Sequence, residues 1–269
     1  MARVKPDGSL SGIMDDGVFR SYNGQTFLCS RPNGVRNPRT LSQQTNRLKL
    51  RNIINMYGTM KDALKDNFQG KTGRQSDYTR FQGCNLLQTS VYVTYDDRFA
   101  SVVAPYIVSF GTLPSIEYHL EGEWLVTDID VAGLELNADT TLSQLSSCLL
   151  ETSGHFSPGD RVELIACRQT NPVGSPRALC AYCEFVLDDN SDILLSQMLN
   201  GFELRVNEEN KLCFRSEEAC GLALVHKRGE GRETFASVQS LAVDNLLLER
   251  YTSEEQKQLS IASYAKKKK

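Results

Sequence analysis

Apolar and polar residues alternate along most of the chain after residue 91, and a period of two is typical of half-buried β-strands. Phe202, Leu204 and Val206 alternate with polar neighbours, a polar turn follows at 208–210, and apolar positions resume at Leu212 and Phe214. We expect a β-hairpin with one dry face there. The same alternation predicts further strands at 106–110, 124–131, 162–168, 179–187, 222–226 and 235–243.

Turn residues separate these runs, and short strands at such spacing predict an antiparallel β-sandwich that resembles the immunoglobulin architecture. In that architecture the inner faces of two sheets share one core. Short helices are expected at 141–149 and 192–199, and a last helix at 253–265. The fold class that follows is α+β and mainly β.

Before residue 91 the apolar period changes to three and four residues, which is the spacing of one face of an α-helix. Thr40 and Gln43 fit a capping box at a helix start, and Gly70 stands where a helix end is expected. We predict a long basic helix at 41–68 and a second helix at 76–87. The apolar positions of the first helix are Leu50, Ile53, Tyr57, Met60, Leu64 and Phe68.

The first 40 residues are rich in glycine, proline, asparagine and arginine, and they contain two short apolar runs at 18–22 and 25–29. Asn23-Gly24 separates the runs, and this pair is a strong hairpin signal because both turn positions need a positive φ. We expect a hairpin on an otherwise extended arm. A two-stranded hairpin is marginal in water, so this one should pack on the body or on another subunit.

Charge separates along the chain, although the total is only −3. Residues 1–74 hold 13 Lys and Arg against 5 Asp, a net charge of +8, which leaves −11 for the remainder. Opposite charges can attract within one molecule, between subunits or toward separate partners. The elements and charges together divide the chain into an extended arm (1–40), a helical segment (41–90), a β-sandwich body (91–250), and a C-terminal helix with a lysine tail (251–269).

Membrane and secretion signals are not seen in the sequence. No stretch of about 18 consecutive apolar residues occurs, and the first eight residues lack the apolar core of a secretion signal. We therefore expect a cytoplasmic protein without membrane contact, or a virion protein if a phage encodes it. The eight cysteines are expected to be free thiols, because such compartments are reducing.

Cys180 and Cys183 are the first candidates for chemistry, because two thiols three residues apart occur in zinc sites and redox pairs. On a strand, residues three apart point to opposite faces, which places Cys183 in an apolar stripe and Cys180 on the other side. A zinc site would need a second pair at similar spacing, but Cys213 and Cys220 are seven apart. We interpret these cysteines as structural.

Acid–base chemistry has few candidates in the sequence. His119, His155 and His226 lie at expected strand ends or in a turn, and we interpret them as surface or turn residues. No nucleophile elbow, zinc-protease motif or phosphate-binding loop occurs. Asp128 and Asp130 share one strand face but lack the oxygen-rich loop of a calcium site, so we interpret them as solvated acids. We predict no catalytic, cofactor or metal site, and a protein that is not an enzyme.

Arginine is frequent on the arm and the first helix, and two kinds of partner fit this pattern. Phe19, Tyr22 and Phe27 stand among the arginines and favour nucleic acid. The acidic remainder of the chain and the lack of a groove-reading motif favour another protein subunit. The residues predicted to bind the partner are Arg20, Arg31, Arg36, Arg39, Arg47 and Arg51.

A signature covers residues 17–68: the hairpin at 18–29, Ser30-Arg31-Pro32, Asn37-Pro38-Arg39-Thr40, Gln44 with Arg47, and a helix that closes at Phe68. With the glycines at 8, 12 and 17, it resembles the N-terminal signature of an uncharacterised β-rich domain family, frequent in Bacteroidetes genomes and in elements related to their phages. The resemblance is strong at the N-terminus and loose after residue 100. It implies that sandwich strands follow the helix, and the family carries no known catalytic residues. The chain departs from it at Asp15-Asp16, where a basic glycine-rich stretch is usual, and in its lysine tail.

The function predicted from these features is that of a non-enzymatic structural protein in a multi-subunit particle, such as a neck, ring or capsid accessory protein of a phage or prophage. The arm would dock on a neighbouring subunit, by adding strands to a sheet edge and by pairing charges. The alternative is a nucleic-acid-binding accessory protein that uses the basic arm and helix. An enzyme assembled from cysteines or carboxylates far apart in the sequence is a third hypothesis that the sequence leaves open.

Overall fold

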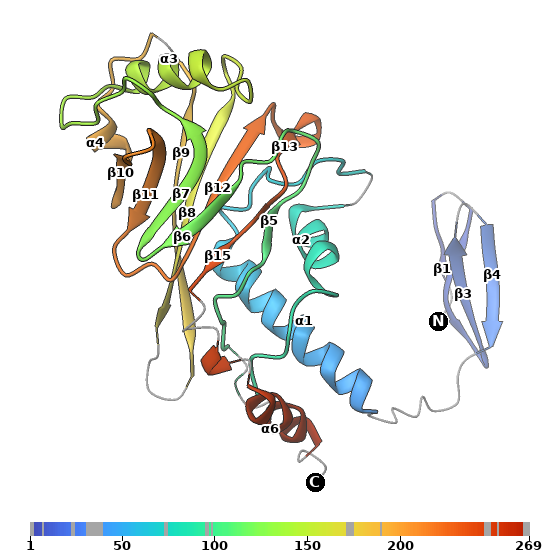
Figure 1. The fold of residues 1–269 in the computed structure, drawn as a ribbon. Coiled ribbons are helices and arrows are strands. Elements are labelled where there is room, and N and C mark those ends of the chain that lie inside the picture. Colours follow the sequence, from blue (N-terminus) through green and yellow to red (C-terminus); the bar gives the residue numbers. More distant parts are fainter. Residues whose placement is uncertain are drawn as a thin grey trace. The chain divides into compact units, whose positions relative to one another are not determined.

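The computed structural model describes residues 3–6, 8–22, 25–30, 40–72, 75–94, 97, 99–170, 175–188, 190–244, 249–251 and 253–265. The chain forms two compact units, residues 1–40 and residues 41–269. It is an α+β protein with mostly antiparallel sheets, as the alternation of apolar and polar residues predicts (Figure 1).

The first unit is a four-stranded antiparallel sheet with the strand order β1-β2-β3-β4. Its strands are β1 Arg3–Val4, β2 Leu10–Met14, β3 Gly17–Tyr22 and β4 Gln25–Ser30. The predicted hairpin is confirmed as β3–β4, although its turn, Asn23-Gly24, lies outside the described residues. The prediction of an otherwise extended arm is wrong, because β1 and β2 complete a sheet. Asp15 and Asp16 form the turn between β2 and β3, with Asp15 at a φ of 48°.

The helices of the second unit begin close to where the sequence places them. Those within the described residues are α1 Leu41–Met60, α2 Asp77–Asn85, α3 Leu142–Thr152, α4 Leu195–Met198, a 3-10 helix at Gly231–Glu233, and α6 Glu254–Ala265. Side chains cap several helix starts: Ser76 accepts the backbone N–H of Thr79, Thr141 forms a capping box with Gln144, and Ser253 accepts the backbone N–H of Gln256. No helix in the described ranges is both long and apolar enough to span a bilayer.

Helix α1 ends at Met60, not at Phe68 as predicted. Phe110 is the reason, because its backbone pairs with residues 67–69, through which the predicted helix would have run. The N–H of Gln69 donates to the carbonyl of Phe110 at 2.8 Å, and the N–H of Phe110 donates to the carbonyl of Asn67 at 3.0 Å. Phe68 is nevertheless fully buried, so it belongs to the core as the apolar pattern predicts, although it does not lie in a helix.

The strands within the described residues of the second unit form three sheets. Their orders are β10-β11-β7-β6, β13-β12-β8-β9 with β15 beside β12, and β14-β5. The strands are β5 Ile107–Ser109, β6 Tyr118–Glu121, β7 Trp124–Asp130, β8 Arg161–Thr170, β9 Arg177–Val186, β10 Phe202–Val206, β11 Lys211–Ser216, β12 Gly221–Arg228, β13 Phe235–Ala236, β14 Gln239–Ser240 and β15 Ala242–Val243. Strand β6 is not among the predicted strands, and the predicted strand at 235–243 is three short ones.

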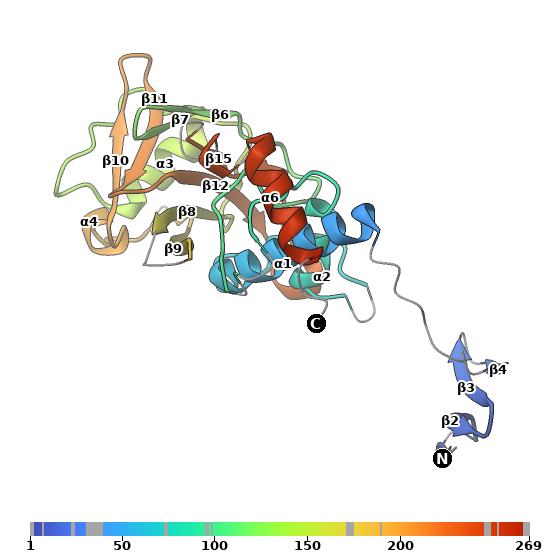
Figure 2. The same cartoon turned by 90° about the horizontal axis from the view of Figure 1, so that it is seen from below.

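We call the sheet of β13, β12, β8, β9 and β15 the central sheet, because it has a core on each face. Alternate residues of its strands point to opposite sides. Ile165, Ala223 and Val225 join α1, α2 and the chain around residues 91–108 in one core. Leu164 and Leu224, on the other face, share a second core with α3 and the sheet β10-β11-β7-β6. Figure 2 shows α1, α2 and α6 together beside the strands.

Candidate functional site

The N-terminal sheet, defined as β1 to β4, has one face whose strand residues are all uncharged. Paired residues of neighbouring strands share a face, and side chains alternate along each strand. The register pairs Val4 with Leu10, Met14 with Gly17, Gly12 with Phe19, and Phe19 with Leu28. Five apolar side chains therefore lie on the same side, and we call them the apolar face: Val4, Leu10, Met14, Phe19 and Leu28.

The side chains of the apolar face are accessible to solvent. Val4 is 70% exposed, Leu28 is 62% exposed and Met14 is 55% exposed. None of the described side chains among residues 1–40 is buried. Such a sheet lacks the buried apolar surface that an independently stable sheet needs, and exposed apolar patches commonly mark interaction sites.

The two faces of the N-terminal sheet differ in charge. The strand residues on the side of the apolar face are all uncharged. The opposite side holds Arg3 and Arg20, together with the apolar residues Ile13, Val18 and Phe27. A partner of the apolar face is therefore selected by apolar contact, whereas a partner of the opposite face meets positive charge.

The structure brings only some of the predicted partner-binding arginines together. Arg47 and Arg51 lie one turn apart on α1, and both line a shallow pocket of about 330 Å³. Arg20 is exposed on β3 in the other unit. The remaining three, Arg31, Arg36 and Arg39, lie outside the described residues.

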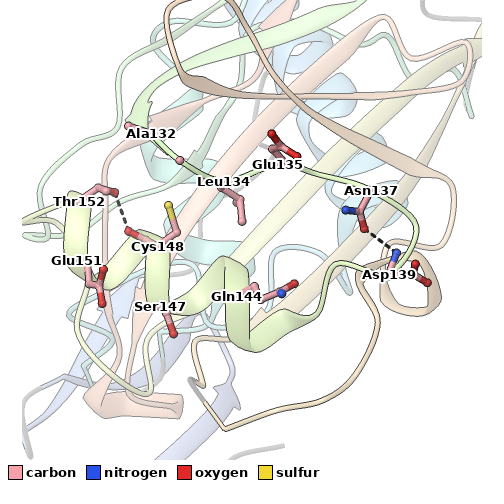
Figure 3. Close-up of a pocket in the computed structure, with 11 residues that line it drawn as sticks. Ala132, Leu134, Glu135, Asn137, Asp139, Gln144, Ser147, Cys148, Glu151 and Thr152 are labelled. Atoms are coloured by element: carbon pink, nitrogen blue, oxygen red, sulfur yellow. Dashed lines mark hydrogen bonds between the residues drawn. The ribbon is translucent and has the colours of Figure 1, made fainter.

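A larger cavity of about 600 Å³ lies between α3 and the loop that follows β7 (Figure 3). Helix α3 contributes Cys148 and Glu151, and the loop contributes Glu135 and Asp139. Thr152 closes one end, where its hydroxyl donates to the carbonyl of Cys148 at 2.7 Å. The three carboxylates give the cavity an acidic lining that would attract cations.

The lining of this cavity does not form a catalytic pair. Burial raises the pKa of the Cys148 thiol, and a thiol of raised pKa is a weak nucleophile at neutral pH. No histidine is among its lining residues to act as a base. Throughout the described parts of the chain, no three His, Cys, Asp or Glu side chains group as a metal site would need.

His226 is fully buried, so the interpretation of this histidine as a surface or turn residue is wrong. Its Nε2 lies 2.7 Å from Oδ2 of Asp160, and Arg228 donates to both oxygens of that carboxylate. Burial lowers the pKa of His226, against the effect of Asp160. Burial opposes ionisation of Asp160 too, but the hydrogen bonds from Arg228 and His226 leave its pKa below the usual value. Ser157 bonds to Arg228 at 2.8 Å rather than to His226, so these residues form no nucleophile–base pair.

A second buried polar cluster lies on the helix-facing side of the central sheet. Lys227 and Glu163 are each 1% exposed, and Nζ of Lys227 lies 3.1 Å from Oε2 of Glu163. Lys227 also pairs with Glu184, and Nδ2 of Asn67 donates to Glu163 at 3.0 Å. Burial raises the pKa of Glu163 to about 7, against the attraction of Lys227. The cavities described above do not reach this cluster, and we interpret it as a structural ion pair.

The apolar face is thus the strongest candidate for a functional site, and the sequence shows only part of it. The runs at 18–22 and 25–29 contain Phe19 and Leu28, but their side of the sheet depends on pairing with β1 and β2. The positive charge of the arm drew the prediction toward arginines instead. No protein-family model, curated protein or solved structure matches the chain.

Proposed function

We propose that this chain is a non-enzymatic structural subunit of a multi-subunit particle, and that its copies join through the apolar face of the N-terminal sheet. The observation that carries the proposal is the exposure of Val4, Met14 and Leu28 on one side of a sheet that has no buried side chain among its described residues. Burial of apolar surface contributes about 25 cal/mol per Å², so covering this face stabilises both the sheet and the assembly.

The partner is a second copy of the chain. Two apolar faces can pack together without bringing like charges into contact, because the strand residues on that side are uncharged. The opposite side would repel its copy, since it carries Arg3 and Arg20. Two sheets packed face to face share a core about 10 Å thick, and a patch that meets its own copy gives a closed two-fold interface.

The particle to which the subunit belongs is proposed from the sequence signature. Residues 17–68 favour a phage or prophage component, such as a neck, ring or capsid accessory protein. The finer fold that we propose for the body is an immunoglobulin-like sandwich, because the central sheet and the sheet β10-β11-β7-β6 share one core. Arg20, on the opposite side of the N-terminal sheet, would then be open to an acidic surface of another component.

Introducing a charge at single positions tests whether the apolar face is the interface. Met14→Lys and Leu28→Lys place a charge on the apolar face, and we expect both to shift the assembly to monomer at micromolar concentration. Ile13→Lys and Phe27→Lys are matched controls, because each lies next to a test position in the sequence but on the opposite side of the sheet. These controls should assemble like the unchanged protein. Sedimentation velocity and native mass spectrometry measure the result.

Several outcomes would overturn the apolar joint. An unchanged protein that is monomeric at all concentrations removes it, and so does equal loss of assembly in the test and control variants. If Leu28→Lys and Phe27→Lys lose assembly and Met14→Lys does not, the interface lies at the edge strand β4 and not on the apolar face. An assembly that dissociates in 1 M NaCl would point to charge pairing by the arginines, because salt screens ion pairs and strengthens apolar contact.

The nucleic-acid alternative has its own signature in the same samples. Binding to duplex DNA or to RNA should weaken steeply with salt, in proportion to the number of phosphates neutralised. Arg20→Glu should reduce that binding, whereas Met14→Lys should not. If the protein is monomeric and binds nucleic acid in this way, it is a nucleic-acid-binding accessory protein and not a structural subunit.

A further inference from the structure

Two cysteines, Cys180 and Cys220, each lie beside the buried Cys167 on the helix-facing side of the central sheet. Cys167 on β8 stands directly opposite Cys180 on β9 in the strand register. Cys220, just before β12, donates its backbone N–H to the carbonyl of Cys167 at 2.9 Å. The thiol of Cys220 lies 3.3 Å from the same carbonyl oxygen. All three are free thiols in this structure.

The backbone bonds show what kind of pair Cys167 and Cys180 form. The carbonyl of Asp160 accepts the N–H of Leu187 at 2.8 Å, so it points toward the β9 side of β8. Successive residues of a strand point their backbone groups to alternate sides, and the register runs unbroken from 161 to 170. Cys167 is seven residues from Asp160, an odd number, so its backbone N–H and C=O point the other way, toward β12. The hydrogen bond from the N–H of Cys220 to the carbonyl of Cys167 shows this directly. Cys167 and Cys180 are a non-hydrogen-bonded pair.

A non-hydrogen-bonded pair brings two side chains close together. Its Cα atoms are about 4.5 Å apart, at the narrow end of the range of about 4.4–6.8 Å that disulfides span. The separation therefore allows a disulfide without movement of the backbone. Because Cys180 is only half-buried, and exposed disulfides are reduced more easily than buried ones, the bond would be reversible.

Exposure decides which thiol reacts first. Cys167 is fully buried, and its pKa is raised well above the usual range, first by its hydrogen bond with the Cys180 thiol and then by burial. Cys180 is only half-buried, so a reagent in solution can reach it. Cys183, three residues along β9, is buried in the core on the other side of the sheet.

We propose that Cys167 and Cys180 form a reversible cross-strand disulfide by exchange with a low-molecular-weight disulfide. The Cys180 thiolate attacks one sulfur of the small disulfide and releases one small thiol, which takes up a proton. Cys167, which lies against Cys180, then loses its proton and attacks the Cys180 sulfur of the mixed disulfide, and the second small thiol leaves and takes up that proton. Two protein thiols are oxidised, one small disulfide is reduced to two thiols, and Cys220 stays reduced. The site would make the central sheet responsive to the redox state of its surroundings.

The test uses the folded full chain and oxidised glutathione as the probe. After incubation, free thiols are alkylated, the protein is digested with trypsin without reduction, and linked peptides are found by mass spectrometry. Cleavage after arginine and lysine places Cys167 in 162–168, Cys180 with Cys183 in 178–205, and Cys220 in 216–227. Fragmentation of the linked peptide separates Cys180 from Cys183. We expect a Cys167–Cys180 link that dithiothreitol removes, and an alkylated Cys220.

Two serine variants separate this pair from its neighbour. Cys180→Ser should abolish the link, and Cys220→Ser should leave it at the level of the unchanged protein. Both replaced residues are half-buried beside Cys167, so they are matched in position, and circular dichroism checks that each variant is folded. A Cys167–Cys220 link, or a mixed disulfide on Cys180 that Cys167 never resolves, would overturn the proposal. So would full alkylation of both cysteines after oxidation.

Discussion

The buried ion pair of Lys227 and Glu163 leads to a prediction with a defined pH dependence. Replacing Lys227 with methionine keeps most of the side-chain volume but removes the cation 3.1 Å from the Glu163 carboxylate. Asn67 would remain as a hydrogen-bond donor to Glu163, and Glu184 is 31% exposed and can be solvated. Glu163 would then be a buried carboxylate without an opposite charge, and its pKa should rise above the value of about 7 that it has beside Lys227.

The magnitude follows from proton linkage. A carboxyl whose pKa is raised by folding stabilises the protein below its unfolded pKa, 4.5, and this contribution is lost as pH rises through the folded pKa. The unchanged protein stops losing stability near pH 7, whereas Lys227→Met continues to lose about 1.4 kcal/mol per pH unit up to its own, higher folded pKa. The variant should therefore be further destabilised at pH 9 relative to pH 7, by at most about 2.7 kcal/mol. Coulomb attraction over the observed distance, about 5 kcal/mol at an effective dielectric of about 20, sets the ceiling.

Urea unfolding at pH 7, 8 and 9 measures this growth, with the fluorescence of Trp124, the one tryptophan, as the signal. The matched control is the double variant Lys227→Met/Glu163→Gln, in which the buried carboxyl is replaced and only the partly exposed Glu184 carboxyl remains beside position 227. Its deficit in the free energy of unfolding should be the same at pH 7 and pH 9. The reasoning is refuted if the deficit of Lys227→Met does not grow with pH, or if the double variant shows the same growth.

Two further predictions concern close packing and acid stability. Gly111→Ala should destabilise the fold by about 1–3 kcal/mol or more, because the new Cβ would lie 2.2 Å from the backbone oxygen of Ala236, whereas Gly154→Ala meets open space and should have little effect in thermal unfolding. His226→Gln tests the lowered pKa of His226: the unfolded chain takes up a proton below about pH 6.5 that the folded site beside Asp160 resists, so stability from this group falls as pH falls. The difference in free energy of unfolding between the unchanged protein and His226→Gln should shrink from pH 7.5 to pH 5, and a constant difference would contradict this account.

Local pattern in the sequence was sufficient for many elements. The alternation of Phe202, Leu204 and Val206 predicts β10, and the polar turn after it predicts the pairing with β11, because both signals lie within about 15 residues. The hairpin β3–β4 follows in the same way from the turn residues Asn23-Gly24 between its two apolar runs. Each of these elements is stabilised by bonds between residues that are close in the sequence, so the local pattern contains the information.

Tertiary structure decided the features that depend on distant partners. The end of α1 at Met60 depends on Phe110, which pairs with the backbone beside Phe68. The same is true of charged groups, because Lys227 can be buried only where the fold places Glu163, 64 residues away in the sequence, within ion-pair distance of it. The position of a charge in the sequence does not show whether an opposite charge will meet it in the core.

The candidate site also has one part that the sequence predicts and one part that depends on tertiary structure. Hydrophobic residues at Phe19 and Leu28 were visible in the predicted hairpin, and so was the need for a partner, because a hairpin alone is marginal. The apolar face was not visible, since Val4 and Leu10 join it only through the pairing of β1 with β2. A shift of one residue in that register would send each side chain to the other side of the sheet. The sequence by itself therefore determined which residues are apolar, and the strand register decided which of them form a surface.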